Sequence, residues 1–157
     1  MKLFIHILSS FLVIIISIIS QGCDDDNPTV QNYCNYTGIT ETDEAGHRSS
    51  NDPDDWCFPD PDNEDSYQFS LLPAYPNPAH PSSEIKFSLP DSVHVIMYMN
   101  STSCERVRIL IDEKLVVGPH SINWDGKDDY GNILDSGIYR CFFIADTFKC
   151  HGDIKLQ

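Results

Sequence analysis

Residues 84–99, EIKFSLPDSVHVIMYM, decide the fold of this chain. Polar and apolar residues alternate over residues 84–89, valine or methionine occupies every second position over residues 93–99, and Pro90 lies between the two runs. An alternation of period two places every second side chain on one face of a β-strand. Pro90 ends the first strand, because proline cannot donate a ladder hydrogen bond. The expected core faces are Ile85, Phe87 and Leu89 in the first strand, and Val93, Val95, Met97 and Met99 in the second.

Similar short runs, separated by turn residues, continue to the end of the chain. They predict four further strands, over residues 107–111, 121–124, 138–145 and 148–156. Helical periodicity is absent from this part of the sequence. Six short strands within residues 71–157 are typical of a small antiparallel β-sandwich, so we expect an all-β fold.

Charge is distributed unevenly along the chain. The 157 residues include 24 acidic and 10 basic side chains, for a net charge of −14. Residues 24–66 hold 13 of the acids and one base, Arg48, whereas residues 71–157 hold 11 acids and 8 bases. So acidic a chain repels a phosphate backbone, and nucleic acid is not an expected partner. The length suits one domain with additional segments and excludes a large multidomain enzyme.

The chain begins in the manner of an exported protein. Lys2 precedes an apolar run over residues 3–19, and Gly22-Cys23 follows, which is the layout of a signal peptide covering residues 1–22. A membrane-spanning anchor is the alternative interpretation. However, a run of about 17 residues reaches only about 25 Å as a helix, short of a hydrocarbon core of about 30 Å.

Gly22-Cys23 resembles a bacterial lipobox, whose cysteine is acylated and becomes the mature N-terminus. Ser20 departs from the bulky aliphatic residue usual at its position, but lipoboxes of the Bacteroidetes group are looser there. The resemblance implies that Cys23 is lipidated and that the exported protein is held at the outer membrane. Asp24-Asp25-Asp26 has two interpretations that stay open. It resembles the acidic tract that sends lipoproteins of that group to the outer face of the outer membrane, and it also suits a solvated tether.

Residues 23–70 are expected to form an acidic, largely disordered linker. Between positions 24 and 66 the only Leu, Ile, Val or Phe residues are Val30, Ile39 and Phe58. These are too few to offset about 1–2 kcal/mol of backbone entropy per ordered residue. Cys34 and Cys57 are the exception, because two nearby thiols usually pair in an oxidising compartment. Such a bridge would stabilise the loop by about 3 kcal/mol, and we expect Trp56 to pack against it.

Acidic residues recur through residues 52–65, which leaves two interpretations open. Carboxylates are hard oxygen ligands suited to calcium, but the glycine and the final glutamate of an EF-hand loop are missing here. A solvated acidic linker is the favoured interpretation. We therefore expect no metal and no cofactor.

Four segments of the C-terminal part resemble a known family: Tyr75-Pro76-Asn77-Pro78, residues 84–90, residues 118–131 and residues 136–139. In order and spacing they are similar to the immunoglobulin-like domain of the flagellar hook-capping protein family, FlgD, and to the related C-terminal sorting domain of type IX secretion. The resemblance covers residues 71–157 and implies an immunoglobulin-like, fibronectin III-like β-sandwich. Cys104-Glu105-Arg106 departs from the family's glycine-arginine pair, and the C-terminal end matches the basic, apolar end of a sorting domain only in part.

The residues that carry this resemblance have scaffold roles. The prolines favour an extended, polyproline-like entry into the first strand, and Trp124 can cap the core. Glycines in the 125–131 turn tolerate positive φ, and Gly137 can start a strand where a side chain would collide with a neighbour. The structural motif comprises Tyr75, Pro76, Asn77, Pro78, Trp124, Asp125, Gly126, Gly131, Gly137 and Tyr139.

No catalytic constellation emerges, and we do not expect an enzyme. The histidines lack the close pairing of a zinc site, and the sequence has no Ser-His-Asp or phosphate-loop pattern. If Cys23 is acylated, five cysteines remain, so at least one is unpaired or bridges to another molecule. Cys104 is the candidate for that role.

Cys141 and Cys150 lie on the two strands of the last predicted hairpin. If the turn centres between residues 145 and 146, the two cysteines face each other and can form a cross-strand disulfide. If it centres between residues 146 and 147, Cys150 faces Phe143 and the cysteines are diagonal neighbours about 7 Å apart. We favour the first register, because two thiols on one face of a hairpin rarely stay reduced in an oxidising compartment.

Together these observations predict a non-enzymatic cell-surface lipoprotein that displays an immunoglobulin-like binding or structural module on an acidic tether. The expected partners are the membrane, through the lipid anchor, and a surface or matrix protein of unknown identity. The alternative is a type IX secretion C-terminal sorting module that directs export and surface attachment. We rank it second, because a lipid anchor and a sorting signal would be competing routes to the surface.

Overall fold

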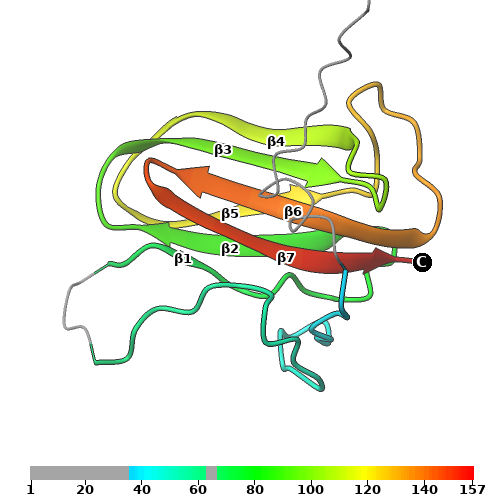
Figure 1. The fold of residues 1–157 in the computed structure, drawn as a ribbon, viewed down its shortest axis with the longest axis horizontal. Coiled ribbons are helices and arrows are strands. Elements are labelled where there is room, and N and C mark those ends of the chain that lie inside the picture. Colours follow the sequence, from blue (N-terminus) through cyan, green and yellow to red (C-terminus); the bar gives the residue numbers. More distant parts are fainter. Residues whose placement is uncertain (1–35, 63–66) are drawn as a thin grey trace, which may run out of the picture.

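The computed structural model describes residues 36–62 and 67–157. The described residues form seven β-strands and no helix (Figure 1). In chain order the strands are β1 (Ser70–Leu71), β2 (Ser83–Leu89), β3 (Val93–Asn100), β4 (Arg106–Leu115), β5 (Gly118–Trp124), β6 (Gly137–Ala145) and β7 (Phe148–Leu156). The prediction of an all-β fold is confirmed over these described residues. Over these residues no helix is long and apolar enough to cross a membrane.

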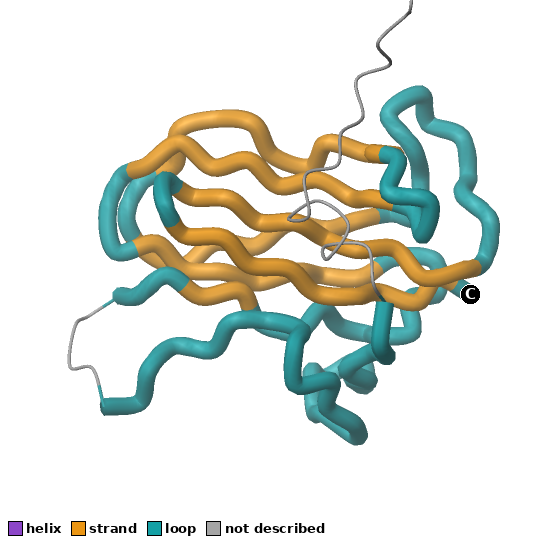
Figure 2. The backbone as a smooth tube through the Cα atoms, in the orientation of Figure 1, coloured by secondary structure: helices purple, strands orange, loops and turns teal. Residues whose placement is uncertain are grey.

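The strands form two antiparallel sheets, with the orders β1-β2-β5 and β4-β3-β6-β7. Figure 2 shows the sheets as two layers, connected by turns at both ends. The rings of Phe87 in β2 and Phe143 in β6 meet between the layers with their centroids 5.1 Å apart. This arrangement is consistent with a β-sandwich.

The alternating runs supply the core, as the sequence predicts. Ile85, Phe87 and Leu89 are buried in β2, and Val95, Met97 and Met99 are buried in β3. Trp124 is fully buried at the end of β5, where its ring meets Tyr139 edge to face. All six predicted strands are present, although β4 and β5 are longer than expected. β1 was not predicted, because two residues are too few to show an alternation.

The favoured register of the last hairpin is wrong. Ala145 pairs with Phe148 and Phe143 pairs with Cys150, so the turn consists of residues 146 and 147. Asp146 has a φ of 54°. Two-residue hairpin turns favour a residue at positive φ, since the twist of the turn then matches that of the strands, and aspartate tolerates this conformation better than most residues. The alternative register, with Cys150 opposite Phe143, is the one observed.

The acidic segment, here residues 36–62, is ordered, whereas we expected a largely disordered linker. Its residues Thr40, Asp52, Asp55 and Trp56 are all buried. Trp56 belongs to the same hydrophobic core as both sheets. In Figure 1 the segment runs along the lower side of the sandwich, below β1 and β7. The sandwich supplies the apolar surface that the segment lacks, which is why its own composition did not predict order.

Candidate functional site

The loop between β5 and β6, residues 125–136, presents the most exposed apolar side chains described. Tyr130 is 91% exposed and Ile133 is 80% exposed. In Figure 1 this loop projects at the end of the sandwich opposite the β4–β5 turn. Exposed aromatic and aliphatic residues that lie close together in a loop are typical of protein contact sites.

Asp128 organises this loop from within. Its Oδ1 accepts hydrogen bonds from the backbone N–H groups of Tyr130 at 2.9 Å and Asn132 at 2.8 Å. Its Oδ2 accepts a third from Nδ2 of Asn132 at 2.9 Å, and these bonds hold the pKa of Asp128 below its ordinary value. Gly126 and Gly131 have φ angles of 71° and 84°, which confirms the expected role of these glycines.

Strand β4 fixes the loop from outside. The N–H of Ile109 donates to Oδ1 of Asp129 at 2.9 Å, and the N–H of Asp129 donates to the carbonyl of Val107 at 3.0 Å. Nη1 of Arg108 also donates to the carbonyl of Asp128. The loop is therefore held in one conformation, and binding through Tyr130 and Ile133 would require little further ordering.

A second feature is the outer edge of β7, which the rest of the chain covers. Asn77, in the Tyr75–Pro78 motif, is fully buried there. Its Nδ2 donates to the carbonyl of Asp153 at 2.8 Å, and its Oδ1 accepts from the N–H of Lys155 at 2.9 Å. Asn77 thus occupies the place of a neighbouring strand. The observed role of the motif is to cap β7, and the peptide bonds before Pro76 and Pro78 are cis.

A buried charge cluster joins β7 to β6 and to the acidic segment. Arg140 in β6 and Asp153 in β7 form a bidentate ion pair, and Tyr36 lies over the guanidinium with its ring centroid at 4.6 Å. Oδ2 of Asp55 accepts from the N–H of Asp153 at 3.1 Å. Burial and then the charge of Asp153 raise the pKa of Asp55 to about 7. Burial likewise raises the pKa of Tyr36 to about 12 and that of Asp153 above its usual range.

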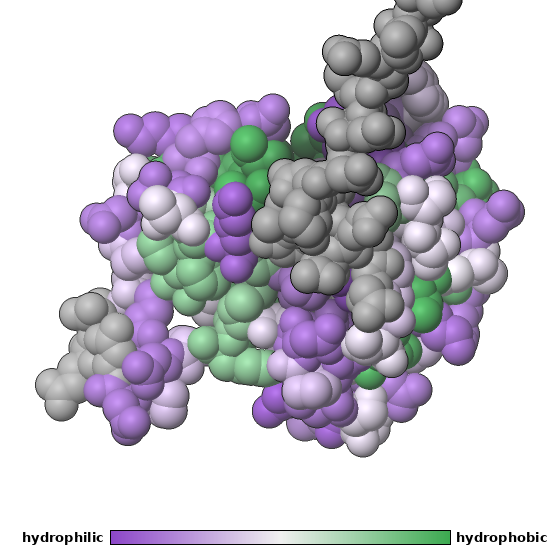
Figure 3. Space-filling model, viewed as in Figure 1, coloured by the Kyte–Doolittle hydropathy of each residue, from purple (hydrophilic) through white to green (hydrophobic). Residues whose placement is uncertain are grey.

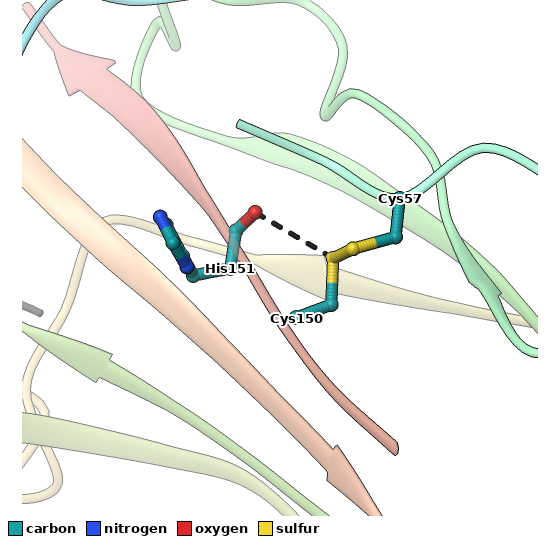
Figure 4. Close-up of a disulfide and its surroundings, with 3 residues drawn as sticks. All are labelled: Cys57, Cys150 and His151. Carbon is teal, nitrogen blue, oxygen red and sulfur yellow. Dashed lines mark hydrogen bonds between the residues drawn. A yellow bond between two sulfur atoms is a disulfide. The ribbon is translucent and has the colours of Figure 1, made fainter. Parts of the chain in front are cut away.

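The cysteines pair differently from the expectation. Cys57 forms a disulfide with Cys150, with Cα atoms 6.1 Å apart (Figure 4). Neither the Cys34–Cys57 bridge nor the Cys141–Cys150 bridge is therefore formed, and Cys141 is a free, buried thiol. The observed register explains why Cys141 and Cys150 are not paired with each other. It leaves Cys150 opposite Phe143 and available to Cys57 of the acidic segment. Cys104, the candidate for a cysteine that is unpaired or bridges to another molecule, is also disulfide-bonded, so it is not unpaired.

Cys23 and Cys34 lie outside the described residues. Of the other motif residues, Asp125 accepts a turn hydrogen bond from the N–H of Lys127 at 3.3 Å. The Tyr139 hydroxyl donates to the carbonyl of Asp135 at 2.8 Å. A side chain at Gly137 would meet nothing closer than 3.9 Å, so the expected collision there does not occur. These residues support the loop and do not form a chemical site.

A hollow of about 350 Å³ lies beside the disulfide. Figure 3 shows hydrophobic surface on this side of the molecule, bordered by hydrophilic residues. The hollow is lined by aromatic and charged side chains, including Tyr98, Phe142, Lys149 and His151. Across residues 36–62 and 67–157, no group of three or more His, Cys, Asp or Glu side chains could hold a metal ion.

Sequence reasoning missed the exposed pair Tyr130 and Ile133 and the buried pair Arg140 and Asp153. The second pair had a usable signal, because the register that places Cys150 opposite Phe143 also places Arg140 opposite Asp153. The first pair had none, since solvent exposure in a loop depends on how the loop is folded.

A scan against protein-family models finds no match for the chain, and a search of curated proteins finds no relative.

Proposed function

We propose that the chain is an exported, lipid-anchored and non-enzymatic binding module with an immunoglobulin-like fold. Its β5–β6 loop contacts a partner protein at the cell surface or in the matrix. The observation that carries the proposal is the rigid presentation of Tyr130 and Ile133, which are 91% and 80% exposed. Large apolar side chains on a preorganised support are the usual centres of binding energy in protein interfaces.

Two observations support export and anchoring. Cys57, Cys104 and Cys150 are all disulfide-bonded, which suits an oxidising compartment. Gly22-Cys23 after the apolar run resembles a lipobox and supplies the anchor. Incorporation of labelled palmitate that is abolished by Cys23→Ala tests the anchor, and an unmodified Cys23 in the mature protein would contradict it.

The loop also indicates the chemistry of the partner. Asp129 and Asp135 are exposed beside Tyr130 and Ile133, and Asp125 is half-buried nearby. Lys127 is the single base within residues 125–136. An apolar pocket bordered by basic side chains would complement this surface.

The test is binding of the labelled protein to the surface of cells of the source organism. The double variant Tyr130→Ser/Ile133→Ser should lose binding. The matched control is Val116→Ser/Val117→Ser, which removes side chains that are 65% and 49% exposed on the β4–β5 turn. Equal binding of the wild type and the loop variant would contradict the proposal, as would equal losses in both variants.

The alternative is a sorting module whose C-terminal strands are read by secretion machinery. The outer edge of β7 is hydrogen-bonded to Trp56, Asn77 and Ala79, so strand addition there would first have to displace these residues. This observation favours the binding module. Surface delivery of a reporter fused ahead of residues 71–157, without Cys23, would instead support sorting.

A further inference from the structure

We infer that the hollow between the acidic segment and the β1–β2 part of the sandwich binds a small organic anion, namely a carboxylate carried on a six-membered ring. The hollow has a volume of about 290 Å³. The β5–β6 loop is not part of it, so the inference is independent of the proposed function. The lining includes two basic, two aromatic and two aliphatic side chains, which are Arg48, Lys86, Phe58, Tyr75, Leu72 and Pro73.

The two basic side chains of the hollow come from different parts of the chain. Arg48 belongs to the acidic segment, and its guanidinium lies over the Phe58 ring, 4.6 Å from the centroid. Lys86 belongs to β2, and its Nζ lies over the Tyr75 ring, 4.7 Å from the centroid. The face of an aromatic ring attracts a cation without neutralising its charge. Two positive charges on aromatic supports therefore line one hollow.

The protein itself compensates these two charges only in part. Within residues 36–62 and 67–157, Arg48 forms no ion pair, and its Nη1 donates a long hydrogen bond of 3.4 Å to Oδ1 of Asn51. Lys86 has a carboxylate neighbour in Glu84, but Nζ and Oε2 are 3.9 Å apart. The same Oε2 atom already accepts the hydroxyl of Tyr75. Both cations can therefore take an additional anionic partner.

Backbone contacts hold Arg48 beside Tyr75. Arg48 lies opposite Thr42 in an antiparallel bridge. Thr42 in turn exchanges two backbone hydrogen bonds with Asn77, at 2.8 and 3.1 Å. Asn77 is fully buried and lies two residues after Tyr75. The walls of the hollow are thus joined to each other, and a ligand would bind with little further ordering of the backbone.

Charge limits the ligand to a small anion. The chain has a net charge of −14, which repels a densely charged polyanion. A single carboxylate suits the two cations, because its two oxygens can accept paired N–H bonds from Arg48 and a further bond from Lys86.

The apolar lining indicates the rest of the ligand. Leu72 and Pro73 add aliphatic surface to that of the two aromatic rings. A cavity of about 150 Å³ can hold a benzene molecule. A hollow of about 290 Å³ therefore has room for a six-membered ring together with its carboxylate. Aromatic acids and sugar acids share this chemistry.

Titration of the ¹⁵N-labelled protein, followed by NMR, tests the class of ligand. The probes are benzoate and glucuronate, with benzamide and glucose as their neutral counterparts and sulfate as an anion without a ring. We expect at least one carboxylate to shift the amide resonances of Gly46, Arg48 and Tyr75 at millimolar concentrations. Tighter binding of benzoate would identify the ligand as an aromatic acid, and tighter binding of glucuronate would identify it as a sugar acid.

Three results of this titration would overturn the inference. The first is that neither carboxylate shifts these resonances. The second is that a neutral counterpart binds as tightly as its carboxylate, which would show that the cations contribute nothing. The third is that sulfate binds as tightly as the carboxylates, which would show that the hollow does not recognise a ring.

Arg48→Gln and Lys86→Gln test the location of the site. Each change removes one cation from the hollow and should weaken carboxylate binding about tenfold. Lys114→Gln is the matched control, because it makes the same change of charge at an exposed position of β4, in the other sheet. Equal weakening by all three variants would indicate general electrostatic attraction and would contradict the site.

The two site variants are expected to fold, because Arg48 and Lys86 are exposed. Their thermal unfolding midpoints check this expectation. If one variant fails to fold, the other variant and the titration of the wild-type protein decide. If both fold and bind the carboxylate as tightly as the wild type, the inference is wrong.

Discussion

Arg140 and Asp153 form a two-point ion pair between β6 and β7, with Nε to Oδ1 at 2.7 Å and Nη2 to Oδ2 at 2.6 Å. Each side chain is only 1% exposed. The acidic segment covers the pair, because Tyr36 lies over the guanidinium and Asp55 accepts the N–H of Asp153. The charge pair lies on a sheet face, and it is buried because the acidic segment covers it.

Removing one partner of this pair should be costly. Arg140→Met leaves the Asp153 carboxylate buried without its counter-ion, and we expect a loss of about 3–5 kcal/mol in the free energy of unfolding. The double variant Arg140→Met/Asp153→Leu should recover most of that loss, because it removes both charges. Urea unfolding measures both. A single variant as stable as the wild type would contradict the prediction.

Stability should fall as pH rises through the range in which Asp55 ionises. The pKa of Asp55 in the folded protein is about 7, above the value of about 3.9 usual for an unfolded chain. Between these values the folded state keeps a proton that the unfolded state has lost. The free energy of unfolding therefore decreases with rising pH, by up to about 4 kcal/mol from this group. Urea unfolding between pH 4 and 8 should show a smaller slope for Asp55→Asn, and an unchanged slope would refute the assignment.

Gly152→Ala should destabilise the protein by about 1–3 kcal/mol, because the added methyl group overlaps the indole of Trp56. Combining it with Trp56→Leu should cost less than the sum of the two single changes. Gly137→Ala is the matched control, since its Cβ would meet nothing closer than 3.9 Å. Thermal unfolding of the four variants tests this prediction. If the destabilisations of the two single variants simply add in the double variant, Gly152 and Trp56 do not compete for the same space.

Trp124→Ala should destabilise the sandwich by about 3–5 kcal/mol, the range for a buried aromatic residue reduced to alanine. Trp124 is fully buried against Tyr139. Tyr130→Ala is a suitable aromatic control, because Tyr130 is 91% exposed and should contribute almost nothing to stability. Equal unfolding midpoints for the two variants would count against the observed packing.

Asp128→Ala should release the β5–β6 loop while leaving the sandwich folded. The variant loses three hydrogen bonds, from Tyr130, Asn132 and the Asn132 side chain. Amide hydrogen exchange at Tyr130 and Asn132 should then accelerate, whereas exchange in β6 should not change. Asp91→Ala, which removes an exposed side chain from the β2–β3 connection, is the control. Unchanged protection at Tyr130 would mean that β4 alone holds the loop.

The sequence by itself determined the strands and their buried faces. Period-two alternation is a local property, and it correctly placed Ile85, Phe87 and Leu89 on the core side of β2. Turn chemistry is local as well, which is why Gly126 and Gly131 were correctly expected at positive φ. These predictions needed no knowledge of what the strands pack against.

The disulfide pairing and the order of the acidic segment were decided only by the tertiary structure, because both depend on contacts between residues that are distant in sequence. The β6–β7 turn is centred one residue later than expected, so Cys150 lies opposite Phe143. Its disulfide partner is Cys57, 93 residues away in sequence. The acidic segment looked unable to fold because its own apolar residues are few, yet Trp56 is buried in a core built by the sandwich. Composition reports what a segment can bury by itself, whereas order also depends on the surface that the rest of the chain offers it.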